Sequence, residues 1–171
     1  MTILTILRHA KSSWDQHDLS DFDRPLNGRG RKSAPLVGRE MRHRKMQFDL
    51  VLASPAERVR ETLEGLANGL GQKLQIDFEP QLYGANVDSL FKRIRALPEA
   101  VHSPLLVGHN PGLHELLLRL TRDDEEGLRN RIVDNLPTAA VALIELPAVH
   151  WAEVEPDSGV IRELILPRDL D

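Results

Sequence analysis

Two arginines and two histidines in this sequence are spaced so that they could act together on a phosphate group. Arg8 and His9 directly follow a short apolar run at the N-terminus, Arg58 lies at the start of a segment with helical periodicity, and His109 follows another apolar run. The planar guanidinium of arginine donates paired hydrogen bonds to phosphate oxygens and keeps its charge at physiological pH. A neutral histidine nitrogen can attack phosphorus, and a charged histidine can donate a proton to a phosphate oxygen. These residue types therefore predict phosphoryl transfer.

The sequence indicates no source of positive charge other than its side chains. No group of Asp, Glu and His has the spacing of a metal site, and no Gly-rich loop ends in Lys-Ser/Thr as in nucleotide-binding proteins. The chain has no cysteine, which excludes a thiol nucleophile and zinc-thiolate sites. We therefore expect a reaction that needs neither a metal ion nor another cofactor.

The length and composition of the chain limit its fold and its partners. A length of 171 residues suits one domain with its own core, so we expect a single domain over residues 1–171. The formal net charge of -4 gives no electrostatic support for binding nucleic acid. No apolar stretch reaches the roughly 18–20 residues of a membrane span, and the N-terminus lacks the features of a signal peptide. We expect a cytoplasmic protein with neither a nucleic-acid nor a membrane partner.

Short apolar runs alternate with longer segments of helical periodicity along most of the chain. Strands are predicted at residues 3–7, 50–53, 74–78 and 105–107, and helices near residues 29–46, 56–70, 86–96 and 112–121. Such alternation is typical of crossover units with parallel strands. Two further strands, at residues 139–146 and 160–166, are predicted to add a hairpin or edge pair. The prediction is an α/β fold, a three-layer α/β/α sandwich around a mostly parallel sheet.

Two predicted helix starts bring polar residues to one edge of this sheet. Ser54 is expected to cap a helix that begins at Pro55, with Glu57 at the third helical position, as in a capping box. Asn110 is expected to cap another helix in the same way, just before Pro111. Both turns follow the carboxyl end of a strand, where open α/β sheets bind ligands and helix N-termini favour anions. The four candidate residues should therefore converge there.

The motifs around these residues resemble those of the histidine phosphatase superfamily, whose fold is phosphoglycerate-mutase-like. The matching segments are Leu7-Arg8-His9-Ala10, Ser54-Pro55-Ala56-Glu57-Arg58 and Val107-Gly108-His109-Asn110-Pro111-Gly112. Other segments resemble the compact SixA-type phosphohistidine phosphatases, namely Arg8-His9-Ala10-Lys11-Ser12, Asp23-Arg24-Pro25-Leu26, Leu82-Tyr83-Gly84-Ala85 and Pro137-Thr138-Ala139. The resemblance rests on the order and spacing of these motifs, which span nearly the whole chain.

This resemblance implies a metal-independent phosphatase with a covalent phosphohistidine intermediate. It implies His9 as the nucleophile, with Arg8, Arg58 and His109 as the phosphate pocket. Arg60 points about 200° around the helix from Arg58 and does not match the motif.

Two residues beyond the motif core have open roles. Ser12 could donate to phosphate from the first loop, or it could be a turn or cap residue, and Arg24 could lie at the rim of the pocket.

The general acid is the least defined part of the predicted site. Many members of the superfamily place a Glu or Asp in an insertion after the third strand, but residues 78–84 are brief here, and Glu79 is the first candidate. Protonation of an alkoxide leaving group accelerates its departure by about 10²–10⁴-fold, whereas the imidazole of phosphohistidine needs less help. Short loops would also leave the pocket accessible to a side chain. We therefore predict a phosphorylated protein, such as a histidine phosphotransfer domain, as the substrate.

Other functions remain open at this point. The substrate could be a small phosphorylated metabolite of a phosphomonoesterase or a mutase in the same superfamily, although the lid-forming insertions of mutases are absent. A non-catalytic module that binds phosphoproteins would keep Arg8 and Arg58 but would not need His9 in line with phosphorus. The acidic segment 15–23 is interpreted as a hydrated loop that could meet a basic partner.

Overall fold

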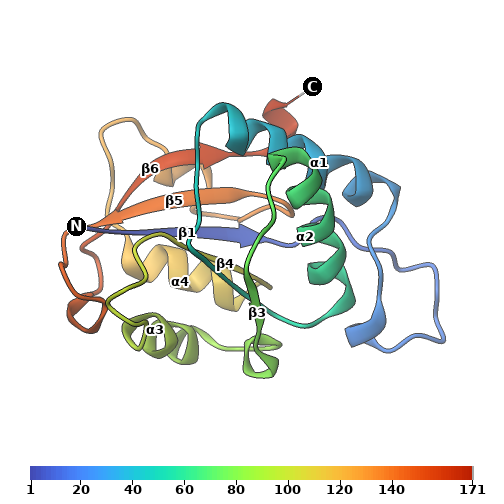
Figure 1. The fold of residues 1–171 in the computed structure, drawn as a ribbon, viewed down its shortest axis with the longest axis horizontal. Helices are drawn as coiled ribbons and strands as arrows, with labels where there is room; N and C mark the ends of the chain where they lie inside the picture. Colours follow the sequence, from blue (N-terminus) through green and yellow to red (C-terminus); the bar gives the residue numbers. More distant parts are fainter. Residues whose placement is uncertain (171) are drawn as a thin grey trace.

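The computed structural model describes residues 1–170 and contains one mixed sheet of six strands (Figure 1). The strands are β1 (Thr2–Arg8), β2 (Leu50–Ala53), β3 (Ile76–Phe78), β4 (Pro104–Gly108), β5 (Val141–Leu146) and β6 (Val160–Ile165). Their order in the sheet is β3-β2-β4-β1-β5-β6. The first four strands pair in parallel, whereas β5 is antiparallel to both β1 and β6. The predicted C-terminal hairpin is confirmed.

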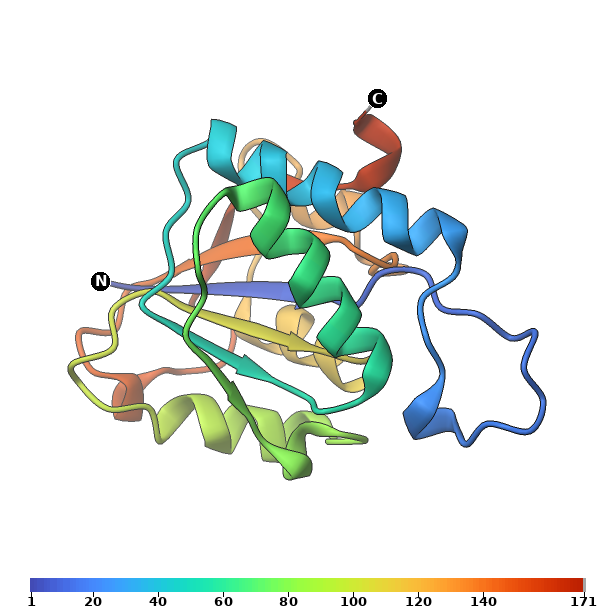
Figure 2. The ribbon, with the colours of Figure 1, turned by 45° about the vertical axis from the view of Figure 1, so that its right-hand side comes forward.

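Four α-helices cover the two faces of the sheet (Figures 1 and 2). They are α1 (Gly28–His43), α2 (Glu57–Leu70), α3 (Val87–Arg95) and α4 (Gly112–Leu120). Successive strand side chains point to opposite faces, and in β1 Leu4 and Ile6 join the core under α3 and α4, whereas Leu7 joins the core under α1 and α2. The three-layer α/β/α sandwich predicted from the sequence is confirmed.

Glycines allow α1 and α2 to pack closely on their face of the sheet. A Cβ atom at Gly38 would lie 2.4 Å from the carbonyl oxygen of Leu66, and one at Gly69 would lie 2.2 Å from that of Pro35. Both distances are shorter than any real contact, so only glycine permits this separation of the helix backbones. The close packing holds α2, which carries Arg58, firmly against α1.

The sheet order brings three loops to the same edge. β4 lies between β1 and β2, with Arg8 opposite Gly108 and Ala53 opposite Val107. Because these strands are parallel, the residues that follow them, His9, Ser54 and His109, all emerge at the carboxyl edge. The long connection from β1 to α1 extends outward beside this edge (Figure 2).

The base of that connection is fixed against the start of α1. A Cβ atom at Gly30 would lie 2.1 Å from the carbonyl oxygen of Lys11, and the amide of Asn27 donates to the same oxygen at 2.9 Å. Glycine is therefore required at position 30, because the two backbones approach too closely for a side chain. This contact positions the segment that follows His9.

Both capping predictions are wrong, although the helices lie where they were expected. The N-cap of α2 is Ala56, and the buried Ser54 uses its hydroxyl in the site described below. The N-cap of α4 is Pro111, and Asn110 turns its amide to donate to the carbonyl oxygen of Leu136 at 2.9 Å. Asn110 therefore serves a long-range contact, and Ser54 combines one with a local contact, because its Oγ also accepts from the amide of Ala56 at 3.3 Å.

Several predicted ends also shift. The first helix ends at His43, before residue 46, because Lys45 adopts a left-handed conformation with a φ of 60°. The third strand is shorter than predicted and begins at Ile76. None of the helices in residues 1–170 is both long and apolar enough to cross a membrane.

Candidate active site

His9 lies at the centre of the carboxyl edge with one ring nitrogen fixed. Only 6% of its surface is exposed, and its Nδ1 lies 2.7 Å from the carbonyl oxygen of Ala10. Burial is the main cause that lowers the pKa of His9 to about 3, so the ring is neutral at physiological pH. Since a carbonyl oxygen can only accept, Nδ1 carries the proton and Nε2 carries the lone pair. The structure thus holds His9 in the tautomer that can attack phosphorus through Nε2.

Two guanidinium groups supply positive charge beside His9. Arg8 donates through Nη1 to the carbonyl oxygen of Leu136 at 3.0 Å, and burial together with the charge of Arg58 lowers its pKa. The side chain of Arg58 is buried, and it donates through Nη1 to the carbonyl oxygen of Asp21 at 2.6 Å. Within residues 1–170, the buried Nε atoms of Arg8 and Arg58 have no hydrogen-bond partner. Two close guanidiniums with unused donors favour a multiply charged anion between them.

His109 is held between Arg58 and Ser54. Its Nδ1 lies 3.3 Å from Nη2 of Arg58, which can only donate, and its Nε2 lies 2.8 Å from Oγ of Ser54. Nδ1 therefore accepts, and Nε2 donates to the hydroxyl. Burial is the main cause that lowers the pKa of His109 to about 4, followed by the charge of Arg58. The ring centroids of His9 and His109 are 5.3 Å apart, so a phosphate can contact both rings.

These side chains open into a cavity of about 410 Å³. Ser12 lines it, and its Oγ accepts from Nη1 of Arg24 at 2.7 Å, so both secondary candidates reach the site. The guanidinium of Arg24 also lies 3.6 Å from the centre of the Trp14 ring. The structure therefore places Arg8, His9, Ser12, Arg24, Arg58 and His109 around one cavity.

Asp21 is a member of this site that the sequence analysis missed. Its carboxylate lies 3.1 Å from Nη2 of Arg58 and 3.1 Å from Nε of Arg24, and it accepts from the hydroxyl of Tyr83 at 2.6 Å. The Tyr83 hydrogen bond is the main cause that lowers the pKa of Asp21 to about 2, with the charge of Arg58 contributing. Residues 15–23 are exposed, as the interpretation of a hydrated loop expects, but Asp21 also reaches into the site and fills a place that an anionic ligand could take.

Glu79 lies outside this site. Its carboxylate accepts two hydrogen bonds from Arg93, at 2.8 Å from Nε and 2.7 Å from Nη2, and it does not line the cavity. The short connection after β3 directs it toward α3, so the structure does not bring it to His9. Arg60 is also elsewhere, because its guanidinium stacks 4.0 Å from the centre of the Phe78 ring.

The arrangement suits a phosphate ester or phosphoramidate whose phosphorus atom faces Nε2 of His9. Arg8 and Arg58 can neutralise the charge on the phosphate oxygens. Once Arg58 turns to the phosphate, Nδ1 of His109 loses its donor and can accept a proton, or donate one when charged. In residues 1–170 no three or more His, Asp or Glu side chains are grouped so that they could hold a metal ion. The cationic side chains that line this cavity are Arg8, Lys11, Arg24 and Arg58.

Comparisons with known proteins identify the family of this chain. The profile of the histidine phosphatase superfamily (branch 1) matches residues 4–89. An uncharacterised protein of Mycobacterium tuberculosis is 32% identical over 164 residues, which cover 95% of this chain and 100% of that protein.

Solved structures also match over almost the full length. One is a candidate phosphohistidine phosphatase, SixA, from Agrobacterium tumefaciens, with a TM-score of 0.81, 27% identity and coverage of 97% of this chain and 98% of that chain. Another, also a candidate SixA, from Nakamurella multipartitia, has a TM-score of 0.82, 25% identity and coverage of 97% and 96%. With a matching family profile and a relative of this identity and coverage, the chain belongs to the histidine phosphatase superfamily.

Proposed function

We propose that this protein removes the phosphoryl group from phosphohistidine on another protein, through a covalent intermediate on His9. Membership of the superfamily supports phosphatase activity, and the SixA-like structures point toward a phosphoprotein. The observation that carries the mechanism is the fixed tautomer of His9, whose Nδ1 donates to the carbonyl oxygen of Ala10 and leaves Nε2 free. A nucleophile held neutral needs no base to activate it.

In the first step, Nε2 of His9 forms a bond to phosphorus while the bond from phosphorus to the leaving nitrogen breaks. The electron pair of that bond returns to the imidazole of the substrate. Arg8 and Arg58 stabilise the negative charge on the transferring oxygens, and Arg58 exchanges Asp21 for phosphate as the substrate enters. Water then attacks phosphorus, the bond between phosphorus and Nε2 breaks with its electron pair returning to His9, and the protons of the water leave with the inorganic phosphate.

The protonation states in the cavity support phosphohistidine as the substrate. Among residues 1–170, Asp21 is the sole acidic side chain that lines the cavity, and with a pKa of about 2 it is ionised at neutral pH. His109 is neutral as well, with a pKa of about 4. Neither Asp21 nor His109 thus holds a proton for an alkoxide in the free enzyme, whereas the second ring nitrogen of phosphohistidine has a pKa near neutrality and can bring its own proton.

Exposed apolar side chains beside the cavity also favour a protein substrate. Six large apolar side chains are exposed in residues 1–170, and three of them, Trp14, Leu19 and Phe22, belong to the connection between β1 and α1. Trp14 is 71% exposed and lines the cavity. Exposed aromatic residues at the rim of a site are typical anchors for a partner protein.

A substrate panel tests the proposal. A phosphohistidine protein, a phosphoserine peptide and small aliphatic phosphate esters are compared by kcat/KM, with His9→Ala as the blank. We expect the phosphohistidine protein to be the best substrate and chelators to leave its rate unchanged. If an aliphatic metabolite ester is better by tenfold or more, the protein is instead a phosphomonoesterase of the same superfamily. If wild type hydrolyses nothing in the panel but binds the phosphoprotein, it is a binding module.

A further inference from the structure

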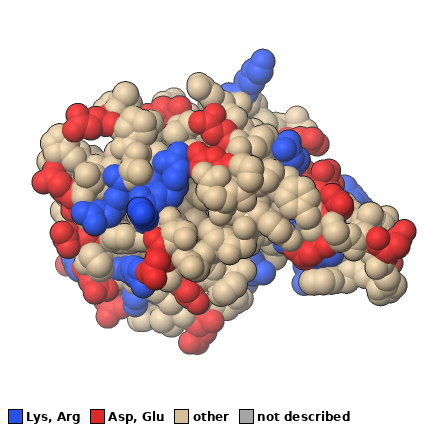
Figure 3. Space-filling model, turned by 90° about the horizontal axis from the view of Figure 1, so that it is seen from below, with Lys and Arg blue, Asp and Glu red and all other residues tan. Residues whose placement is uncertain are grey.

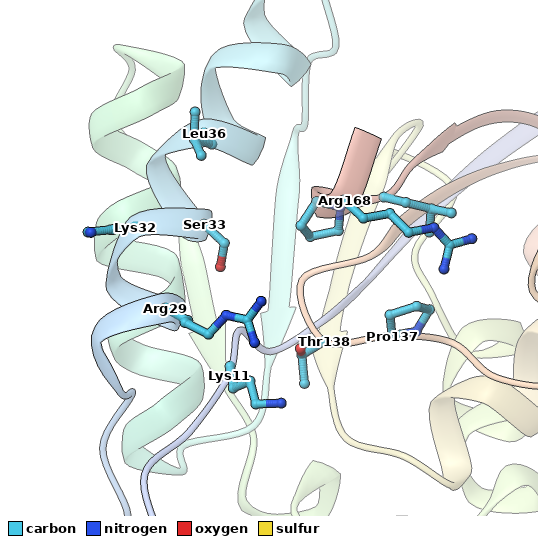
Figure 4. A pocket seen from close by; sticks show the side chains of 10 residues that line it. Lys11, Arg29, Lys32, Ser33, Leu36, Pro137, Thr138 and Arg168 are labelled. Carbon is cyan, nitrogen blue, oxygen red and sulfur yellow. The ribbon is translucent and has the colours of Figure 1, made fainter. Parts of the chain in front are cut away.

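A second cavity of about 440 Å³ lies next to the proposed active site, between the N-terminal part of α1 and the chain that follows β6 (Figure 4). It shares Lys11 and Thr138 with the cavity around His9, so the two cavities adjoin. Its lining residues are Lys11, Arg29, Lys32, Ser33, Leu36, Pro137, Thr138, Leu166, Pro167 and Arg168. Nothing in the mechanism above uses this second cavity.

The charge of the second cavity has one sign. Four of its lining residues are cationic, and none is acidic. Within residues 1–170, none of these four cations forms a salt bridge with a carboxylate. On the surface seen in Figure 3, Lys and Arg also gather in a patch, but Asp and Glu side chains lie beside it. An uncompensated basic cavity on a chain with a net charge of -4 points to an anionic ligand.

The guanidinium of Arg29 is directed toward the active site, whereas the side chains of Lys32 and Arg168 extend away from Arg29 (Figure 4). In Figure 4 the guanidinium of Arg29 points toward Lys11 and Thr138, the two residues shared with the first cavity, and Arg168 lies across from it near Pro137. Arg29 also sits in the first turn of α1, where the helix dipole is already positive and a cation is unfavourable. A carboxylate bound beside Arg29 would offset the repulsion between Arg29 and the positive end of the helix dipole. It would also offset the repulsion between Arg29 and the nearby Lys11.

The apolar part of the cavity narrows the choice of ligand. Leu36, Leu166 and two prolines line it together with the cations. A sugar phosphate has little apolar surface to place against these side chains, whereas a peptide can combine an apolar side chain with neighbouring carboxylates. The mixed lining therefore favours an acidic peptide segment over a small metabolite with a second phosphate.

We propose that this second cavity binds an acidic segment of the substrate protein that flanks the phosphorylated histidine. This inference rests on the proposed function, since it assigns the recognition of the same phosphoprotein. Phosphohistidine would enter the cavity around His9, and the flanking carboxylates would contact Arg29 and Arg168. The second cavity would then select among phosphorylated proteins without touching the phosphoryl group.

Peptides with a non-hydrolysable phosphohistidine analogue test this inference. One peptide carries Asp and Glu beside the analogue and a neighbouring Leu, and the other carries Asn and Gln at the same positions. We expect wild type to bind the acidic peptide about five- to thirtyfold more tightly at 0.1 M salt, as two weakly screened charge contacts provide. The preference should shrink at 1 M salt, where the screening length is about 3 Å.

Matched variants distinguish binding in the second cavity from attraction to the overall charge of the protein. Arg29→Gln/Arg168→Gln should reduce the preference to less than about threefold, whereas Arg39→Gln/Lys73→Gln removes the same charge from exposed positions outside the cavity and should retain it. Thermal unfolding of each variant checks that it is folded. Equal binding of both peptides by wild type, or a full preference in Arg29→Gln/Arg168→Gln, would overturn the inference.

Two further measurements distinguish the possible failures. Hydrolysis of p-nitrophenyl phosphate, which is too small to reach the second cavity, should be similar in wild type and Arg29→Gln/Arg168→Gln. If wild type hydrolyses this ester through His9 but shows no peptide preference, the second cavity is wrongly assigned and the proposed mechanism stands. If a small bisphosphate binds more tightly than the acidic peptide and depends on Arg29 and Arg168, the occupant is a metabolite and the inference fails.

Discussion

Replacing Asp21 by asparagine should raise the affinity of the active site for phosphate-like anions such as vanadate. The Asp21 carboxylate lies 3.1 Å from Nη2 of Arg58, so an incoming anion must displace it from that donor. The asparagine side chain keeps the shape but removes the charge that competes with the ligand. The contact of Arg58 with the backbone carbonyl of Asp21, at 2.6 Å, is unaffected by the substitution.

The size of the effect follows from how exposed the competing ion pair is. The side chain of Asp21 is 51% exposed, whereas that of Arg58 is only 6% exposed. Exposed ion pairs contribute about 0.2–1 kcal/mol, and charge-assisted hydrogen bonds to a buried partner contribute more. A competing contact of about 0.5–1.4 kcal/mol corresponds to a two- to tenfold lower inhibition constant for vanadate.

The pH dependence of this effect has a defined sign. The pKa of Asp21 is lowered to about 2, so the carboxylate is ionised throughout the neutral range. The difference between wild type and Asp21→Asn should therefore be constant at neutral pH. It should decrease only as the pH falls toward about 2, where wild-type Asp21 itself becomes neutral.

Competitive inhibition by vanadate during hydrolysis of an aryl phosphate is the assay. Asp18→Asn is the matched control, because Asp18 is exposed in the same connection and makes the same change of charge. We expect this control to stay within about twofold of wild type. A higher inhibition constant in Asp21→Asn would show the opposite, that Asp21 assists anion binding.

Three other predictions concern residues of the site and its surroundings. Arg58→Ala should lower kcat by about 10²–10³-fold, as removal of one transition-state donor does, whereas Arg60→Ala should leave kcat near the wild-type value. The ¹⁵N spectrum of His9 should show a neutral ring with its lone pair on Nε2 until the pH approaches 3, because burial lowers its pKa; a titration midpoint near 6.5 would contradict this. Glu79→Gln should keep kcat but lower the free energy of unfolding in urea by about 1 kcal/mol, because it weakens the paired contact with Arg93. A large loss of kcat in Glu79→Gln would restore it as a general acid.

The main features of the fold and the four central site residues could be predicted because they depend on local patterns. Apolar runs of strand length end at Arg8 and near His109, and parallel strands place their carboxyl ends at one edge. The side-chain tautomers could not be predicted in this way. The proton on Nδ1 of His9 depends on the direction of a single carbonyl group, that of Ala10, which no periodicity records.

Contacts between distant segments explain what the sequence analysis missed or misassigned. Asp21 reaches Arg58 across 37 positions, and its sequence context is that of an ordinary polar loop. Ser54 accepts locally from the amide of Ala56 at 3.3 Å, but its hydroxyl also bonds to His109 at a distance of 55 positions. In both cases a long-range partner gives the residue a role that its local sequence does not record, as is common at functional sites.

Trapping the phosphoryl group on the protein shows whether His9 is the nucleophile. Wild type is mixed with a radiolabelled aryl phosphate, quenched within milliseconds in alkaline denaturant, which preserves phosphohistidine, and digested for mass spectrometry. We predict one acid-labile phosphoryl group on His9, and none in a folded but inactive His9→Ala. Label on a serine, an aspartate or another histidine would show that His9 is not the nucleophile. Turnover that persists in His9→Ala would show the same.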